Sequence, residues 1–233
     1  MKPYYDEGGI TIYHGDCREI GAWLTADVLV TDPPYGIAWT SHGVSRTSYR
    51  DRANGVYPGT HRPVASIKND LTTAHRDAAI EMWGDRPGFV FGSLLIAPPQ
   101  FVRQVAIYVK PKDAGSLTGL ATLRRDVEGI YVIGKSDEWV PYGQRSSVFR
   151  TGWAVVGTPA GLSRKSGHPH AKPTDVLREL IGLHSGVVAD PFAGSGSTLR
   201  AAKDLGRRAI GVEIEERYCE IAARRMGQEV LAL

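Results

Sequence analysis

The chain has 233 residues and a formal net charge of +3, with 28 basic against 25 acidic side chains. This length suits one compact domain, and the sequence has neither an apolar run that could cross a bilayer nor a secretory leader. We therefore expect a single cytoplasmic domain over residues 1–233. Its two cysteines, Cys17 and Cys219, lack metal-ligand spacing, which argues against a disulfide framework and a zinc site.

Apolar stretches alternate with helical patterns along most of the chain. The expected strands cover residues 10–13, 27–31, 88–92, 105–110, 129–133, 186–190 and 209–213. This alternation predicts an α/β fold with a doubly wound, mostly parallel sheet. The strands at 105–110 and 129–133 follow each other without a clear helix, which predicts an antiparallel hairpin at the sheet edge.

Four helices are expected from the same patterns. One begins at Leu71, and the others cover residues 174–183, 198–205 and 215–227. Asp70 directly precedes the first helix and is expected to cap its N-terminus. The last helix carries Tyr218, Ala222 and Met226 on one face, which predicts an amphipathic helix packed on the sheet.

The first candidate site is the tetrapeptide Asp32-Pro33-Pro34-Tyr35, which follows the apolar run 28–30. A carboxylate, a proline-stiffened backbone and an aromatic ring can together hold a flat base and accept hydrogen bonds from its exocyclic amine. The alternative is a rigid loop leaving the strand, with Tyr35 as an ordinary half-buried ring.

The second candidate site is the segment 190–198, Asp-Pro-Phe-Ala-Gly-Ser-Gly-Ser-Thr, which also follows an apolar strand. Its glycines, Gly194 and Gly196, allow a tight turn and a close approach to a ligand at the start of a helix. No Gly-Lys-Ser/Thr follows, so the segment is not a P-loop, and Leu199 replaces the third glycine of a dinucleotide fingerprint. The segment therefore predicts a cofactor site of another kind.

Glu213 ends a short apolar strand roughly twenty residues after the glycine turn, the usual distance for an acid that binds ribose hydroxyls. We interpret Glu213 as a ribose ligand. The alternative is an acid at a helix N-terminus, because Glu215 and Glu216 follow it.

In order and spelling, these segments resemble the S-adenosylmethionine-dependent amino-methylating DNA methyltransferases of the β class, which place the catalytic half first. Residues 32–35 resemble the catalytic motif, residues 190–198 the cofactor loop, and Glu213 the ribose acid. The segment 13–16, Tyr-His-Gly-Asp, is similar to the family's Gly-Asp that contacts the cofactor adenine. Residues 168–173, His-Pro-His-Ala-Lys-Pro, resemble its His-Pro-Thr-x-Lys-Pro. Five ordered matches span nearly the whole chain and are highly specific.

The resemblance implies a Rossmann-like methyltransferase sheet with a catalytic half at about 1–135 and a cofactor half at about 168–233. Only about residues 134–167 and the loop 37–67 remain for target recognition, which is short for this family. The catalytic residues it implies are Asp32, Pro33, Pro34 and Tyr35. The cofactor-binding residues it implies are Asp16, Lys172, Asp190, Phe192, Gly194, Ser195, Gly196, Thr198 and Glu213.

The function implied is transfer of a methyl group from S-adenosylmethionine to the N6 amine of a flipped adenine in double-stranded DNA, without metal. Asp32 at the first motif position favours adenine in the family. The alternatives are cytosine N4, an RNA base, or an inactive nucleic-acid-binding homologue. A homodimer and a cognate restriction nuclease are further partners that the resemblance allows.

Cations concentrate in two acid-poor stretches, 37–67 and 140–174, which flank the proposed catalytic strand ends. The residues expected to contact DNA phosphates are Arg46, Arg50, Arg52, Arg145, Arg150, Arg164 and Lys165. The alternative is an ordinary solvated surface. His168 and His170 lack a third ligand nearby, so we expect no metal site there.

Overall fold

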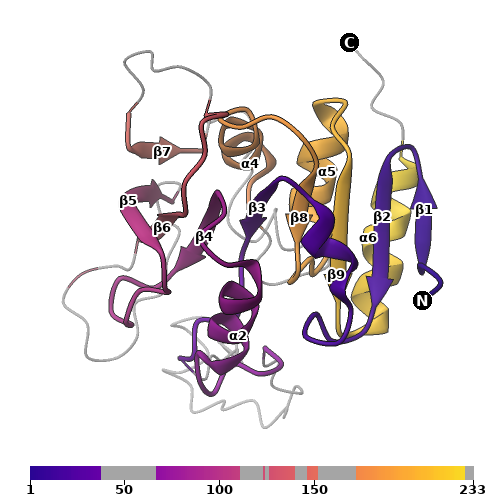
Figure 1. The fold of residues 1–233 in the computed structure, drawn as a ribbon, viewed down its shortest axis with the longest axis horizontal. Helices are drawn as coiled ribbons and strands as arrows, with labels where there is room; N and C mark the ends of the chain where they lie inside the picture. The colour runs from indigo at the N-terminus through magenta and orange to yellow at the C-terminus, as the bar shows by residue number, and fades with distance from the viewer. Residues whose placement is uncertain (38–66, 111–122, 124–125, 140–145, 152–171, 229–233) are drawn as a thin grey trace, which may run out of the picture.

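A computed structural model of the chain describes residues 1–37, 67–110, 123, 126–139, 146–151 and 172–228 (Figure 1). The strands are β1 (Tyr5–Glu7), β2 (Ile10–His14), β3 (Val28–Thr31), β4 (Gly88–Gly92), β5 (Val102–Val109), β6 (Val127–Ile133), β7 (Val148–Arg150), β8 (Val188–Asp190) and β9 (Ala209–Glu213). The helices are the 3-10 helix η1 (Gly21–Thr25) and the α-helices α2 (Ala74–Trp83), α4 (Thr174–Ile181), α5 (Ser197–Asp204) and α6 (Glu216–Gly227). Within these ranges no helix combines the length and apolar character needed to cross a membrane.

The described strands form one sheet with the order β1-β2-β9-β8-β3-β4-β6-β5-β7. The central neighbours, from β2 through β9, β8 and β3 to β4, are all parallel. Both β5 and β4 pair antiparallel with β6. The prediction of a mostly parallel sheet with an antiparallel hairpin is thus confirmed.

Two short strands, β1 and β7, were not predicted and lie at the two edges of this sheet. β7 pairs parallel with β5, so the hairpin lies one strand inside the edge. Each edge strand has 3 residues, which is too short to show a periodic pattern in the sequence.

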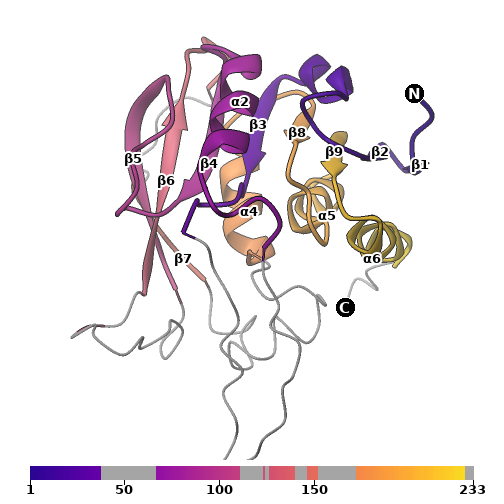
Figure 2. The same cartoon turned by 90° about the horizontal axis from the view of Figure 1, so that it is seen from below.

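Helices cover both faces of the sheet, with α4, α5 and α6 on one face and α2 and η1 on the other (Figure 2). Successive side chains of a strand point to opposite faces. Val28 of β3 therefore packs in the same cluster as Leu177 of α4, whereas the next residue, Leu29, packs in the cluster of Trp83. Burial on both faces explains why this central strand is continuously apolar.

The predicted capping role of Asp70 is wrong. Helix α2 begins at Ala74, and the side chain of its N-cap residue, Thr73, makes no capping hydrogen bond. Asp70 is 2% exposed and its Oδ1 accepts a hydrogen bond of 2.7 Å from the backbone N–H of Gly36. The carboxylate therefore fixes the backbone directly after Tyr35.

Candidate active site

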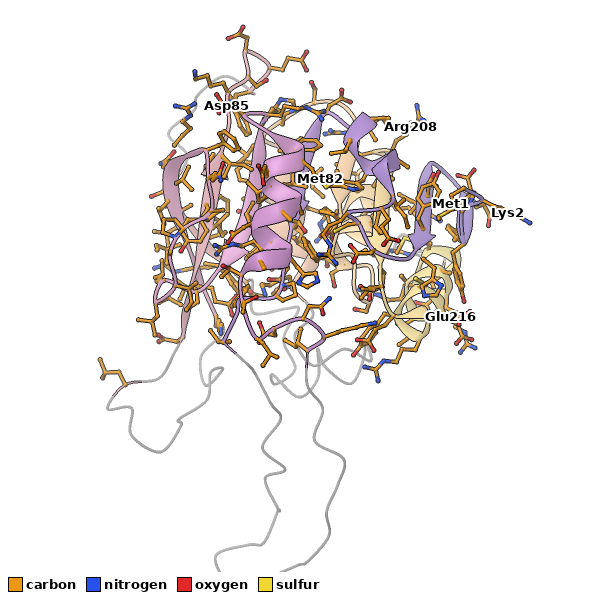
Figure 3. The ribbon with its side chains drawn as sticks, turned by 60° about the horizontal axis from the view of Figure 1, so that its bottom comes forward. Met1, Lys2, Met82, Asp85, Arg208 and Glu216 are labelled. Carbon is orange, nitrogen blue, oxygen red and sulfur yellow. The ribbon has the colours of Figure 1, made fainter. Side chains whose placement is uncertain are left out.

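The predicted site residues gather at the carboxyl ends of the parallel strands. Asp32 follows β3, Asp190 ends β8 and Glu213 ends β9. Glu213 is also in register with His14 at the end of β2, two residues before Asp16. Figure 3 labels Glu216, which begins α6 at this edge, and Asp85 and Arg208, which precede strands at the opposite edge. Open α/β sheets bind ligands at the carboxyl edge.

The Asp32 carboxylate accepts hydrogen bonds on both of its oxygens. Oδ1 accepts one of 2.9 Å from the Tyr35 hydroxyl, and Oδ2 accepts one of 2.6 Å from the Lys172 ammonium. The Asp32 side chain remains 25% exposed, so a ligand can still reach it. The structure thus joins the first motif to Lys172, 140 residues later, which the sequence had suggested only as a cofactor residue.

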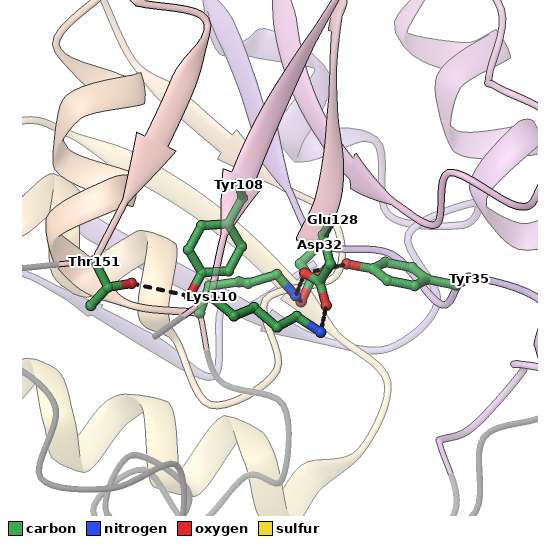
Figure 4. A network of polar contacts seen from close by, with 7 residues as sticks. Asp32, Tyr35, Tyr108, Lys110, Glu128 and Thr151 are labelled. Carbon is green, nitrogen blue, oxygen red and sulfur yellow. Dashed lines mark hydrogen bonds and ion pairs between the residues drawn. The ribbon is translucent and has the colours of Figure 1, made fainter. Parts of the chain in front are cut away.

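Glu128, near the start of β6, is a site residue that the sequence analysis missed. Its Oε2 lies 3.2 Å from the Tyr35 hydroxyl, whose single proton it shares with Asp32, and 3.3 Å from Lys172 Nζ. Its Oε1 lies 2.7 Å from Lys110 Nζ (Figure 4). Because β6 runs antiparallel to β4, its first residues reach the edge where the parallel strands end. The one sequence signal was an acid directly before the apolar run 129–133.

These charges change one another's ionisation. Burial opposes ionisation of Glu128, but Lys172 and Lys110 outweigh it and lower its pKa to about 2. Burial likewise opposes the charge on Lys172, but the carboxylates of Asp32 and Glu128 outweigh it and raise the pKa of Lys172. Burial raises the pKa of Asp32, and the Lys172 ammonium opposes this rise only in part.

The glycine loop turns into α5 with Gly196 in the left-handed region at φ 78°. A Cβ on Gly196 would lie 2.9 Å from Cβ of Ala222 in α6, so only glycine fits between the loop and that helix. Ser195, Thr198 and Asp190 are buried, whereas Phe192 and Gly194 are partly exposed. Among the predicted cofactor residues of this loop, Phe192 and Gly194 are therefore the ones open to a ligand.

Glu213 bridges the glycine loop and the start of α6. Its Oε2 accepts a hydrogen bond of 2.8 Å from Gly194 N–H, and its Oε1 accepts one of 2.7 Å from Glu215 N–H. Burial raises its pKa. The bond from Glu215 N–H fits the alternative interpretation of Glu213 as an acid at a helix start. The bond from Gly194 N–H instead supports the glycine loop.

Asp16 lies at the end of the neighbouring strand β2. Both of its oxygens accept from the Arg18 side chain, at 2.9 and 2.6 Å, and this pairing lowers the pKa of Asp16 to about 2. His75 of α2 also lowers it. The buried Nδ1 of His75 has no hydrogen-bond partner among the residues that the structure describes.

Asp190 joins the proposed catalytic and cofactor strands. Its Oδ1 accepts hydrogen bonds from the Thr31 hydroxyl (2.7 Å) at the end of β3 and from the Phe192 N–H (3.2 Å). Burial raises its pKa to about 6, although these bonds favour the ionised form. A raised pKa means that the fold favours the protonated acid, so this contribution to stability is present below about pH 4 and lost as the pH rises through about 6.

We expect the free energy of unfolding, relative to Asp190→Asn, to fall by on the order of 3 kcal/mol between pH 4 and pH 7, because one pKa unit corresponds to about 1.4 kcal/mol. Asparagine cannot ionise, yet its carbonyl can still accept from Thr31. Urea unfolding of both proteins across this range measures the difference. Parallel stability curves would show that Asp190 titrates normally.

Of the predicted phosphate-contacting cations, the structure describes Arg150, which ends β7 and is exposed. The others, Arg46, Arg50, Arg52, Arg145, Arg164 and Lys165, lie outside the described residues. His168 and His170 lie outside them as well.

Solved structures with this fold include DNA methyltransferases. PvuII DNA methyltransferase (cytosine-N4-specific) superposes with a TM-score of 0.62 at 15% identity, covering 99% of this chain and 91% of its own. M1.HpyAVI, solved as a SAM complex, gives a TM-score of 0.57 at 21% identity, covering 93% of this chain and 99% of its own. At these identities the likeness shows the fold.

Sequence comparisons show the family. The Type II methyltransferase M.ScaI of Streptomyces caespitosus is 25% identical over 272 residues, covering 100% of this chain and 86% of the relative. The putative methylase YubD of Escherichia coli K12 is 28% identical over 231 residues, covering 94% of this chain and 88% of the relative. The model of the N6/N4 DNA methylase family matches residues 94–224, more than half of the chain. The chain therefore belongs to this DNA methylase family.

Proposed function

We propose that this DNA methylase transfers a methyl group from S-adenosylmethionine to the N6 amine of an adenine flipped out of double-stranded DNA. The observation that carries the proposal is the partly exposed Asp32 carboxylate, held by Tyr35 and Lys172 at the carboxyl edge of the sheet. The glycine loop and Glu213 lie at the same edge, on the neighbouring strands β8 and β9.

The proposed mechanism rests on hydrogen-bond acceptors. When bound, S-adenosylmethionine supplies a methyl group already activated by its sulfonium. The exocyclic amine of a base is a poor nucleophile because its lone pair is delocalised into the ring. Asp32 and the carbonyl of Pro33 would accept hydrogen bonds from the two N–H groups of this amine. These bonds would favour a pyramidal nitrogen and stabilise the positive charge that grows on it. Tyr35 would stack on the base, which must leave the duplex to reach this site.

The described residues fit the proposed cofactor. Glu213 ends β9, and Asp16 lies two residues after the end of the adjacent parallel strand β2, so that a ribose and an adenine would each meet a carboxylate. The buried Nδ1 of His75 needs a polar partner, and its position near Asp16 suits the polar edge of a bound adenine. Phe192 and the Gly194 backbone would line the remaining wall.

DNA contact is proposed for the cations of the two acid-poor stretches. Arg150 ends the edge strand β7 and is exposed, as contact with a phosphate requires. The remaining cations share its acid-poor stretch or the stretch that follows the tetrapeptide in the sequence. A cytoplasmic location, a homodimer and a cognate nuclease are proposed on the family resemblance alone.

Cytosine N4 is the second candidate target, because a carboxylate acceptor recognises an amine and not a particular ring. The fold likeness to the cytosine-N4-specific PvuII enzyme favours keeping it. The test digests DNA from cells expressing the protein and measures both methylated nucleosides by mass spectrometry, with Asp32→Ala as the control. We expect N6-methyladenine in the wild type only. N4-methylcytosine alone would establish the second candidate, and modified RNA without modified DNA would overturn the proposal.

A further inference from the structure

A lysine ammonium in contact with the proposed acceptor of an amine needs an explanation. Lys172 is 9% exposed and occupies one oxygen of Asp32 at 2.6 Å. It also lies 5.4 Å from the ring centroid of Tyr35 and 5.2 Å from that of Phe91, so aromatic faces fix its position. A cation held so firmly here competes with the substrate amine, and its presence points to a function of its own.

That function follows from the partial burial of Asp32, whose side chain is 25% exposed. Without a nearby cation, a buried carboxyl tends to keep its proton. A protonated Asp32 would offer a hydroxyl donor where the target amine needs an acceptor. Lys172 opposes this, because its charge favours the ionised form of Asp32.

Glu128 completes the arrangement. One of its oxygens, Oε2, lies 3.2 Å from the Tyr35 hydroxyl and 3.3 Å from the Lys172 ammonium, the same two groups that contact Asp32. The single hydroxyl proton of Tyr35 is thus shared between the two acids. Lys110 neutralises the second oxygen at 2.7 Å. Two carboxylates and two ammonium groups therefore balance, and Lys172 is shared between two acids instead of pairing with Asp32 alone (Figure 4).

We infer that Lys172 and Glu128 form one positioning unit, in which Lys172 keeps Asp32 ionised and Glu128 holds Lys172 and Tyr35 in place. The inference rests on the proposed function, because it assigns Asp32 as the acceptor. Among the described residues, the ionisable groups that face Asp32 are Lys172 before α4, Glu128 on β6, Tyr35 on its own loop and Asp190 at the end of β8. Lys172 is the cation of this set, so removing its charge should raise the pKa of Asp32.

The first test titrates Asp32 directly, in protein without cofactor or DNA. Carbon-13 NMR of protein labelled at the aspartate carboxyl carbons follows each acid, and the signal missing in Asp32→Asn identifies Asp32. Lys172→Met should raise the Asp32 midpoint by about 1 to 3 pH units, the usual effect of losing an adjacent opposite charge. Lys172→Arg keeps the charge and should restore most of the midpoint. Lys135→Met, at a lysine 72% exposed in another ion pair, is the matched control and should leave it unchanged.

The second test separates Glu128 from a simple repulsive charge. Glu128→Gln removes a like charge beside Asp32 and should lower its midpoint, which alone would leave Asp32 a better acceptor at neutral pH. We nevertheless expect kcat to fall about 10- to 100-fold with the Kd for S-adenosylmethionine within a few-fold, because a neutral amide at position 128 holds the Lys172 ammonium and the Tyr35 hydroxyl less firmly than the carboxylate does. Glu220→Gln, on the exposed face of α6, is the matched control.

The inference that Lys172 keeps Asp32 ionised would be overturned if the Asp32 midpoint in Lys172→Met lay within 0.3 pH unit of wild type, roughly a tenth to a third of the expected change. A wild-type kcat in Glu128→Gln would overturn the inference that Glu128 holds Lys172 and Tyr35 in place. If Lys172→Met does not fold, Lys172→Gln gives the same titration with a polar side chain. Because the NMR titration needs no turnover, a wild-type protein that methylates nothing would sink the proposed function and leave the result on Asp32 and Lys172 standing.

Discussion

Replacing Asp32 by alanine is expected to lower the rate of methyl transfer by about 100- to 1,000-fold, the usual effect of removing one group that stabilises transition-state charge. The Kd for S-adenosylmethionine should stay within a few-fold of wild type. Cofactor binding should persist because the two acids have different partners at this edge of the sheet. Asp32 contacts Tyr35 and Lys172, whereas Glu213 contacts the glycine loop. Radioactive methyl transfer to DNA measures the rate, and calorimetry measures cofactor binding.

Two further variants make this result interpretable. Asp32→Asn keeps the side-chain volume and an oxygen for the Tyr35 hydroxyl, so a large loss there reflects the missing charge. Asp85→Ala removes an aspartate whose ion pair with Arg103, at 2.9 Å, lies at the opposite edge of the sheet, and it should retain full activity (Figure 3). A folded Asp32→Ala protein that binds no cofactor would instead place Asp32 in the cofactor site.

Most of the fold could be predicted because the sheet is buried on both faces. Strand β9 covers 209–213, as the sequence predicted, and α4 covers 174–181 within the predicted 174–183. Continuous apolar strands and amphipathic helices leave a strong local pattern. The residue before a helix is less informative: Asp70 matched a capping pattern, yet it accepts from Gly36 because α2 begins 4 residues later.

The hydrogen-bond and ion-pair network around Asp32 was harder to predict because it depends on strand order. Asp32 and Glu128 meet only because β3 pairs with β4 and β4 pairs with β6, which runs in the opposite direction. The acid directly before the run 129–133 was too weak a signal to single out Glu128, which lies in a hairpin strand of ordinary composition. The bond between Lys172 and Asp32 spans 140 residues and was equally invisible to spacing. The sequence motifs predicted the residues at the ends of the parallel strands, whereas only the strand order shows that Glu128 and Lys172 are their partners.

Glu213→Ala is expected to weaken S-adenosylmethionine binding by about 1 to 3 kcal/mol, a rise in Kd of roughly 5- to 150-fold. The carboxylate is 8% exposed and accepts from the N–H groups of Gly194 and Glu215. Its removal leaves two backbone donors without their partner, at the glycine loop and at the start of α6. Calorimetry with the folded variant measures the change in Kd.

The matched control is Glu220→Ala, a glutamate of α6 whose side chain is 54% exposed and pairs with Arg224. It should bind the cofactor as the wild type does, because exposed ion pairs contribute little. Glu213→Gln distinguishes two origins of the loss. Its carbonyl can keep one backbone bond, but its amide nitrogen then faces the other N–H, so loop support is half restored. Binding in Glu213→Gln as weak as in Glu213→Ala would show that the charge itself holds the cofactor, whereas an unchanged Kd in the alanine variant would remove Glu213 from the site.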